Sequence, residues 1–175
     1  TQSYRMIHLT PADYKTMPWA NGKGVTVEML RVDGEAGLKW RLSRASVVEN
    51  GPFSIFPGIE RNLTVITGPG FDLVGDQRLQ ARPLVPVAFA GDVAIAAEGV
   101  AAPSDDFNVM TARGLPLPEV SVLDGAAQLG AGGTLAIFAL AAATVNGQAL
   151  GSYDLVLTET AAQINGAVIA VRLFG

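Results

Sequence analysis

Residues 40–52 read Trp-Arg-Leu-Ser-Arg-Ala-Ser-Val-Val-Glu-Asn-Gly-Pro, and this stretch decides the fold class. Trp40 and Leu42 fall on one face of an extended chain, and Arg41 and Ser43 fall on the other. Such alternation is typical of a β-strand with one face in a core. The Asn-Gly-Pro at the end of the stretch predicts a turn, because Gly and Pro interrupt regular structure.

The same pattern of short strands and turns continues in both directions, with 20 Gly and 10 Pro among 175 residues. Further strands are expected at 26–32, 63–66, 71–74, 85–89, 134–140, 153–157 and 167–173. Hairpins are expected at Gly68-Pro69-Gly70, Asn146-Gly147 and Asn165-Gly166, since Asn-Gly favours type I′ turns. No stretch predicts a convincing helix, so the sequence predicts an all-β protein with little helix.

The composition of the sequence changes after Arg113-Gly114. Pro116 and Pro118 predict a stiff link, and the remainder, 120–174, is more apolar and almost free of charge. Two successive β-rich parts predict two fused barrels: an N-terminal half, 1–114, and a C-terminal half, 115–175. Strands can be shared between such halves.

Composition excludes several classes of partner and chemistry. There is no Cys, which removes disulfides, thiolate metal sites and Cys nucleophiles. Twelve Lys and Arg against 16 Asp and Glu give a net charge of −4, so we expect no nucleic-acid partner. No apolar run approaches the roughly 20 residues that span a bilayer. The first residues lack a signal-peptide pattern, although a processed chain can have lost one, and we expect a cytoplasmic protein without a membrane partner.

The sequence contains few residues suited to metal binding or to histidine-based catalysis. The single histidine, His8, lies in an apolar stretch, and no Asp/Glu cluster has ligand spacing. We therefore expect no metal, no cofactor and no His-based acid–base or Ser-His-Asp catalysis.

Polar residues capable of contacting a ligand occur in separate segments. Asn21 lies in the Gly-rich segment 19–26, which lacks the ending of a phosphate loop and forms either a pocket mouth or a tight turn. The segment 50–58, with two Pro and two Phe, is largely explained as a structural loop. Arg61 follows it at the start of a strand, and either binds a carboxylate or forms a surface ion pair with Glu60 or Glu28.

The last polar segment is 105–114. Asp106, Asn108 and Met110 share one parity, and Arg113 adds a cation nearby. A donor, an acceptor and a cation in one short stretch suit recognition of a small polar ligand or support of its pocket. They also suit a latch between the two barrels.

Taken in order, these segments resemble the HutD/Ves family. The resemblance covers residues 7–114 and rests on five motifs that occur in the same order. They are Trp-x-Asn-Gly-x-Gly-x-Thr-x-Glu at 19–28, Trp-Arg-x-Ser-x-Ala at 40–45, Gly-Pro-Phe-Ser-x-Phe-Pro-Gly at 51–58, Arg-x-Leu-Thr at 61–64 and Asp-Phe-Asn-x-Met-x-x-Arg at 106–113. It implies a bicupin of two fused double-stranded β-helix (jelly-roll) barrels without the usual cupin metal ligands. It also implies a regulatory role in histidine utilisation through binding of an intermediate such as formylglutamate or urocanate, and for Ves members a link to stress responses.

Residues and resemblance together favour a binding protein for a small anionic metabolite. The candidate ligand-binding residues are Asn21, Arg41, Ser43, Arg61, Asp106, Asn108 and Arg113. A metal-free isomerase or epimerase with Glu28 or Asp106 as base is one alternative. A structural or interaction protein is the other, and the low-charge C-terminal third allows a homodimer under every hypothesis.

Overall fold

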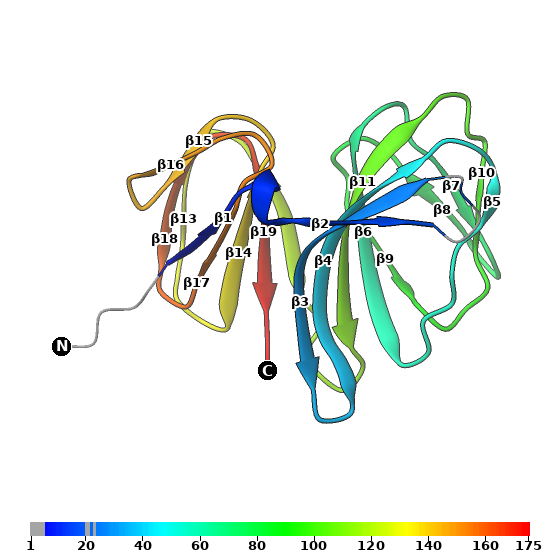
Figure 1. The fold of residues 1–175 in the computed structure, drawn as a ribbon, viewed down its shortest axis with the longest axis horizontal. Coiled ribbons are helices and arrows are strands. Elements are labelled where there is room, and N and C mark those ends of the chain that lie inside the picture. Colours follow the sequence, from blue (N-terminus) through cyan, green and yellow to red (C-terminus); the bar gives the residue numbers. More distant parts are fainter. Residues whose placement is uncertain (1–5, 20–21, 23) are drawn as a thin grey trace. The chain divides into compact units, whose positions relative to one another are not determined.

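A computed structural model describes residues 6–19, 22 and 24–175 of the chain. Within these ranges the protein is all-β, and its single helical segment is the short 3-10 turn η1 (Pro11–Asp13) (Figure 1). The ladders between neighbouring strands are antiparallel. This confirms the prediction of an all-β chain with little helix. In the part of the chain that the structure describes, no helix is long and apolar enough to cross a membrane.

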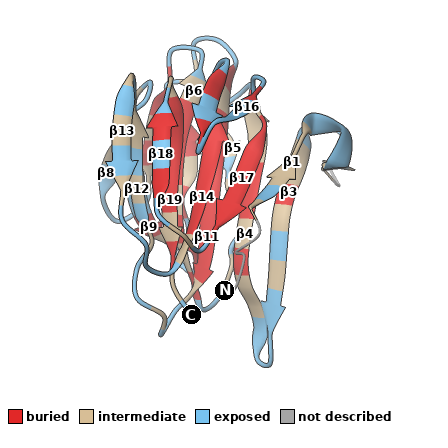
Figure 2. Cartoon of the chain, turned by 90° about the vertical axis from the view of Figure 1, so that its left-hand side faces the viewer, coloured by how far each residue is buried: buried red, intermediate tan, exposed pale blue. Residues whose placement is uncertain are grey.

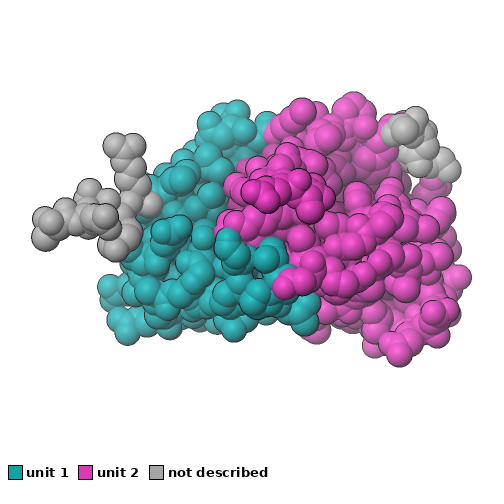
Figure 3. All heavy atoms as spheres, turned by 90° about the horizontal axis from the view of Figure 1, so that it is seen from below, with its two compact units in different colours: residues 1–14, 115–175 teal, residues 15–114 magenta. Residues whose placement is uncertain are grey.

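The chain forms two compact units, which Figure 3 shows in different colours. Unit 2 is Lys15–Gly114, and unit 1 combines the chain up to Tyr14 with Leu115–Gly175. The first residues therefore group with the C-terminal segment, whereas the sequence alone placed them in the N-terminal half.

Unit 2 contains two sheets. The six-stranded sheet has, in spatial order, β2 (Lys15–Pro18), β3 (Val25–Gly34), β4 (Gly37–Val47), β11 (Ser104–Ala112), β6 (Ile59–Thr67) and β9 (Val87–Ala90). The four-stranded sheet has β5 (Gly51–Pro52), β10 (Ala96–Glu98), β7 (Phe71–Val74) and β8 (Arg78–Ala81). The two sheets share a core that includes Leu63, Val65, Phe71 and Leu73, each no more than 1% exposed.

The predicted hairpin at Gly68-Pro69-Gly70 is wrong. Strand β6 before it belongs to the six-stranded sheet, and β7 after it belongs to the four-stranded sheet, so the chain crosses between sheets here. Gly68 and Gly70 have φ of +84° and +86°. A Cβ at Gly70 would lie 2.1 Å from the Ala81 carbonyl oxygen, so the tight crossing requires glycine.

Unit 1 also contains two sheets. The five-stranded sheet has β1 (Ile7–Leu9), β17 (Leu155–Thr158), β14 (Thr134–Ala139), β19 (Val168–Leu173) and β12 (Glu119–Leu123). The four-stranded sheet has β13 (Ala126–Leu129), β18 (Ala162–Asn165), β15 (Ala143–Val145) and β16 (Gln148–Leu150). In both units the sheets as described do not close on themselves, so the predicted pair of jelly-roll barrels is not confirmed.

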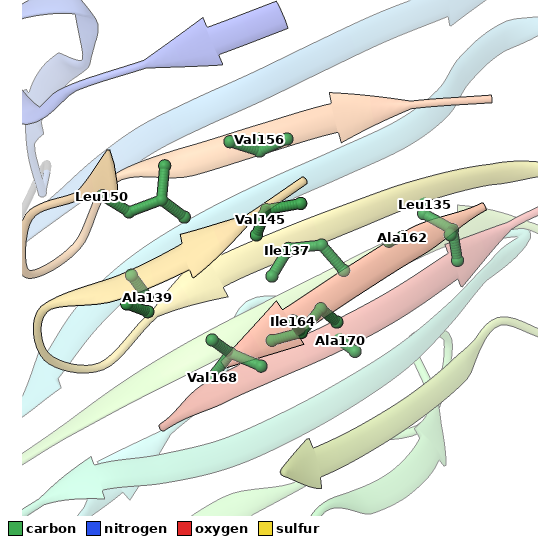
Figure 4. Close-up of a cluster of buried hydrophobic side chains, with 11 residues drawn as sticks. Leu135, Ile137, Ala139, Val145, Leu150, Val156, Ala162, Ile164, Val168 and Ala170 are labelled. Carbon is green, nitrogen blue, oxygen red and sulfur yellow. The ribbon is translucent and has the colours of Figure 1, made fainter. Parts of the chain in front are cut away.

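The core of unit 1 lies between its two sheets. Figure 2 shows β14, β17 and β19 almost wholly buried, and Figure 4 shows their aliphatic side chains packed with those of β15 and β18. Ile137 from one sheet and Val145 from the other are both fully buried. The apolar, charge-poor C-terminal sequence is thus accounted for by a core buried within this unit.

The two Asn-Gly pairs of unit 1 have different roles. Asn146-Gly147 connects β15 and β16 as a two-residue hairpin, with φ of +51° and +78°, which confirms the prediction. Asn165-Gly166 connects β18 to β19, which lie in different sheets, so the predicted hairpin there is wrong. At Gly166 a Cβ would lie 2.6 Å from the Ala143 Cβ, so this glycine serves close packing at a crossing.

Candidate functional site

Unit 2 holds a cavity of about 360 Å³. Strands β4, β6 and β11 supply one side of its lining, and the segment from Pro52 to Phe56, together with Trp19 and Thr26, supplies the rest. A volume of this size suits a small molecule, because small-molecule sites typically range from about 300 to 1,000 Å³.

Strands β4 and β11 present polar side chains to the cavity from adjacent positions. Ser43 on β4 pairs in register with Asn108 on β11, and Arg41 pairs with Met110. All four side chains line the cavity, whereas Leu42 between them is fully buried away from it. The parities expected for both strands are confirmed, since alternate residues of a strand face opposite sides.

Arg61 lies on β6 and is buried, with 8% of its surface exposed. Its Nη2 donates to the Asn108 Oδ1 at 3.3 Å, while its Nε is buried without a hydrogen-bond partner. Among the described residues no carboxylate lies within ion-pair distance of the Arg61 guanidinium. Burial lowers the pKa of Arg61 to about 10, with Asp106 opposing the shift, so the side chain remains charged at neutral pH.

Three aromatic rings surround the Arg61 guanidinium. Its Cζ lies 5.5 Å from the ring centroid of Phe53, 5.3 Å from that of Phe56 and 5.1 Å from that of Phe89. Rings at these distances stabilise a cation through their quadrupoles, and they exclude water from it. The cation is thus held in a weakly polar setting that strengthens its attraction for an anion.

Phe53 and Phe56 line the cavity, although their loop was expected from the sequence to be largely structural. The Phe53 backbone N–H donates to the Ile95 carbonyl at 2.8 Å, and the Phe56 N–H donates to the Gly91 carbonyl at 2.8 Å. The loop is therefore fixed to neighbouring backbone and aims both rings at Arg61. The signal in the sequence was the spacing of the two Phe within a Pro- and Gly-bounded loop just before an arginine.

Arg41 reaches the same cavity but already has a counter-ion. Its Nε donates to the Glu28 Oε1 at 2.8 Å, and both side chains are 12% exposed. The two charges largely cancel at the cavity wall. Of the two arginines in the lining, Arg61 is therefore the one whose charge is not matched by a direct partner.

Asp106 is 1% exposed, and its Oδ1 accepts a short hydrogen bond from the Asn108 Nδ2. Burial raises the pKa of Asp106 to about 7, against the hydrogen bond from Asn108 and the attraction of Arg61. Asn108 therefore bridges a buried cation and a buried carboxyl group, with its amide oxygen toward Arg61 and its amide nitrogen toward Asp106.

Trp19 and Thr26 close another part of the lining. The Trp19 indole N–H donates to the Thr26 Oγ1 at 2.9 Å. A Cβ at Gly24 would lie 3.0 Å from the indole ring, so glycine allows the ring to pack against the backbone there. Asn21, the candidate from this Gly-rich segment, lies outside the described residues.

Arg113 lies apart from the cavity lining and is 44% exposed at its side chain. It donates to both Asp92 carboxylate oxygens at 2.6 Å and to the Glu60 Oε1 at 2.7 Å. Its backbone N–H donates to the Gly58 carbonyl at 2.8 Å. The contacts place Arg113 at the end of the loop that carries Phe53 and Phe56, where it supports the loop and does not face the cavity.

No group of three His, Asp or Glu side chains suitable for a metal ion occurs among residues 6–19, 22 and 24–175. The cavity offers the buried Arg61 cation in an aromatic setting, the ion-paired Arg41, the Asn108 amide, the buried Asp106 carboxyl group and hydroxyl groups from three residues. These groups recognise a small polar or anionic molecule by charge and hydrogen bonds.

The fold defines the class as a cupin-like all-β protein. A cupin conserved-barrel protein from Leptotrichia buccalis is 8% identical and superposes with a TM-score of 0.55, covering 85% of this chain and 88% of its own, which supports the fold alone. The chain belongs to the HutD family, whose sequence model matches residues 11–171.

Two relatives support that assignment along nearly the whole chain. An uncharacterised 21.2 kDa protein encoded in the region 3′ of hutC in Pseudomonas putida is 34% identical, over 94% of this chain and 92% of its own. The structure of HutD from Pseudomonas fluorescens SBW25, described for a formate condition, is 30% identical with a TM-score of 0.89, covering 97% of this chain and 98% of its own. The family is linked to the histidine-utilisation locus.

Proposed function

We propose that this protein binds a small carboxylate in the unit 2 cavity, without a metal ion, and that the binding regulates histidine utilisation. The observation that carries the proposal is Arg61, a buried cation that lines the cavity with no carboxylate at ion-pair distance among the described residues. A buried unpaired charge is costly, and a ligand carboxylate would supply the missing counter-ion.

The remaining lining favours a carboxylate over a cation or a neutral sugar. Asn108 and Ser43 supply hydrogen bonds beside Arg61, and Phe53 and Phe56 supply apolar contact for a short carbon skeleton. Arg41 is neutralised by Glu28 and adds hydrogen-bonding capacity without a second net charge. The arrangement fits a ligand that presents a carboxylate to Arg61 from a small planar or aliphatic body.

The family context indicates which carboxylates to test. The HutD structure from Pseudomonas fluorescens is described for a formate condition, and formate is the simplest carboxylate. Formylglutamate and urocanate, intermediates of histidine degradation, are carboxylates of a size comparable with the cavity. A protein of this kind would report the level of such an intermediate to the pathway.

A thermal-shift series tests the proposal. The purified protein is melted with formate, formylglutamate, urocanate, glutamate, histidine and unrelated acids and sugars. A carboxylate at a hundredfold excess over its dissociation constant should stabilise the protein by about 2.7 kcal/mol, which is visible as a shift of a few degrees.

Two arginine variants make the series specific. In Arg61→Met the carboxylate-induced shift should disappear. In the matched control Arg78→Met, which removes an exposed arginine of the four-stranded sheet outside the cavity lining, the shift should remain. Equal shifts in wild type and Arg61→Met, or no shift with any carboxylate, would refute the proposed site.

A metal-free acid–base enzyme is a second candidate. The observation in its favour is the pKa of Asp106, raised to about 7, which is the range that suits a general base or acid beside a cation. Glu28, the other carboxylate considered as a base, is held by Arg41. Turnover of any carboxylate found to bind, lost in Asp106→Asn while binding persists, would establish this function, and unchanged ligand after prolonged incubation would exclude it for that ligand.

The finer architecture is also a proposal. We infer that unit 1 and unit 2 correspond to the two halves of a bicupin, because each combines a larger antiparallel sheet with a four-stranded one around an apolar core. An experimental structure in which either unit departs from the jelly-roll strand order would contradict this inference.

A further inference from the structure

Asp106 is a buried carboxyl group in the wall of the cavity. One of its oxygens accepts from Asn108, and no side chain forms an ion pair with it among the described residues. Its strand, β11, lies between β4 and β6 in the six-stranded sheet, so charges on these two strands decide its electrostatic surroundings.

The charged groups near Asp106 are few. Arg61 on β6 attracts it but is separated from it by the Asn108 amide. Arg41 on β4 is neutralised by Glu28 of β3. Asp105 precedes it in the sequence and accepts hydrogen bonds from Ser46 and Thr67 outside the cavity lining, and its negative charge adds to the rise in the pKa of Asp106.

An anion that binds at Arg61 changes this balance in one direction. It places a negative charge one amide group away from Asp106, and it neutralises the cation that favoured the ionised carboxylate. Both changes disfavour a negative charge on Asp106, because two carboxylates that share a buried site rarely ionise together.

We propose that Asp106 contacts the bound carboxylate as a neutral acid and donates its proton in a hydrogen bond to it, so that each anion is bound together with one proton. This inference rests on the proposed carboxylate site and adds its mode of recognition. Asp106 selects ligands that present an acceptor toward both it and Arg61. Burial already raises the pKa of Asp106 to about 7, and the further rise caused by the bound anion keeps it protonated throughout the neutral range.

Proton uptake is measured directly by isothermal titration calorimetry with sodium formate as the probe. Titrations at one pH in two buffers of different ionisation enthalpy give the number of protons bound with each formate. At pH 8 the wild type should take up most of one proton, and at pH 6 almost none, since Asp106 is then already neutral. The affinity for formate should be about tenfold lower at pH 8 than at pH 6, as linkage requires.

Three variants identify the residue that takes up the proton. Asp106→Asn, which keeps a neutral hydrogen-bonding side chain, should bind formate with no proton uptake and no change in affinity between pH 6 and pH 8. Asp76→Asn, an exposed carboxylate of unit 2 outside the lining, and His8→Asn, the single histidine and a residue of unit 1, should retain wild-type uptake.

The outcomes separate the two proposals. Formate binding without proton uptake in the wild type overturns the role of Asp106 and leaves the carboxylate site standing. Uptake that persists in Asp106→Asn also overturns it. Absence of binding of any carboxylate at pH 6, where Asp106 does not oppose an anion, refutes the carboxylate site itself.

Discussion

Replacing Arg61 with methionine should leave the stability of the ligand-free protein nearly unchanged, although it removes a buried charge from the centre of the site. Methionine has a similar length and is apolar, and it packs favourably against aromatic rings. The prediction follows from two opposing terms of similar size, each of which the structure allows to be estimated.

The first term is the net electrostatic cost of burying the cation, in which desolvation outweighs the attraction of Asp106. A pKa lowered from 12.5 to about 10 corresponds to a cost of about 3 kcal/mol, at 1.36 kcal/mol for each pH unit. The unfolded chain holds the proton more tightly, so the cost is complete at neutral pH and is relieved only as the pH rises from about 10 toward 12.5. Methionine removes this cost.

The second term is the loss of contacts made by the guanidinium. The hydrogen bond to Asn108 contributes about 1–2 kcal/mol, and three partly desolvated cation–π contacts contribute about 0.5–1 kcal/mol each. The sum is about 3–5 kcal/mol, from which new contacts of methionine with Phe53, Phe56 and Phe89 recover about 1 kcal/mol. The net change should therefore lie within about 1.5 kcal/mol of zero.

Urea denaturation at pH 7 in carboxylate-free buffer measures this change. Arg61→Ala serves as the comparison and should cost about 3 kcal/mol or more, because it leaves a void beside the rings. A loss above about 3 kcal/mol in Arg61→Met would refute the reasoning and would make Arg61 a structural residue that holds the aromatic rings together. A change near zero, with carboxylate binding abolished, would identify it as a residue retained for binding.

Three further outcomes are expected. Glu28→Gln should destabilise the protein by about 2–3 kcal/mol in urea denaturation, because it leaves Arg41 largely buried without its counter-ion. Formate should bind to this variant severalfold more tightly by calorimetry, and weaker binding would contradict the assigned charge balance. Gly166→Ala should cost more than 2 kcal/mol and Gly147→Ala about 1 kcal/mol, since only the former creates a clash, and equal losses would argue against the crossing geometry. Asp106→Asn should stabilise the ligand-free protein by up to about 4 kcal/mol at pH 8 and by much less at pH 5. The reason is that the raised pKa of Asp106 makes the stability of the wild type fall as the pH rises from about 4 to 7. A gain in stability that is independent of pH would contradict this prediction.

The parts of the site that lie on regular strands were predictable from sequence. Arg41 and Ser43 on β4, and Asp106 and Asn108 on β11, share faces because the period of a strand is two, and all four line the cavity. Antiparallel pairing of β4 with β11 then brings the two pairs together. That pairing joins segments more than 60 residues apart, and no local pattern specifies it.

The connections between strands, and the site residues that depend on them, were not predictable from the sequence. Gly68-Pro69-Gly70 and Asn165-Gly166 have hairpin composition, yet both connect different sheets. Glycine permits the required φ in either case, and the choice is made by what packs against the turn, which lies elsewhere in the sequence. The aromatic setting of Arg61 has the same origin, because Phe89 reaches it from a strand that the sequence placed only by its apolar residues.

Arg113 is close in sequence to the residues of the site but does not line the cavity. It lies five residues after Asn108, but the chain has passed the end of β11, and Asp92 and Glu60 hold its side chain at the surface. A cation near a polar strand in sequence is therefore not evidence that it reaches the same cavity.

Strand β1 has a consequence for the order of events during synthesis. Ile7 pairs with Leu157, so β1 is synthesised about 150 residues before its partner strand. Lys15–Gly114 is continuous and has its own core, so it can fold as soon as it leaves the ribosome, while β1 remains unpaired until β17 emerges. Completion of unit 1 therefore waits for β17, and a product truncated before β17 would carry an unpaired strand available to proteases and chaperones. Pulse-labelled hydrogen exchange during refolding should show protection of β1 no earlier than that of β17, and earlier protection of β1 would contradict this order.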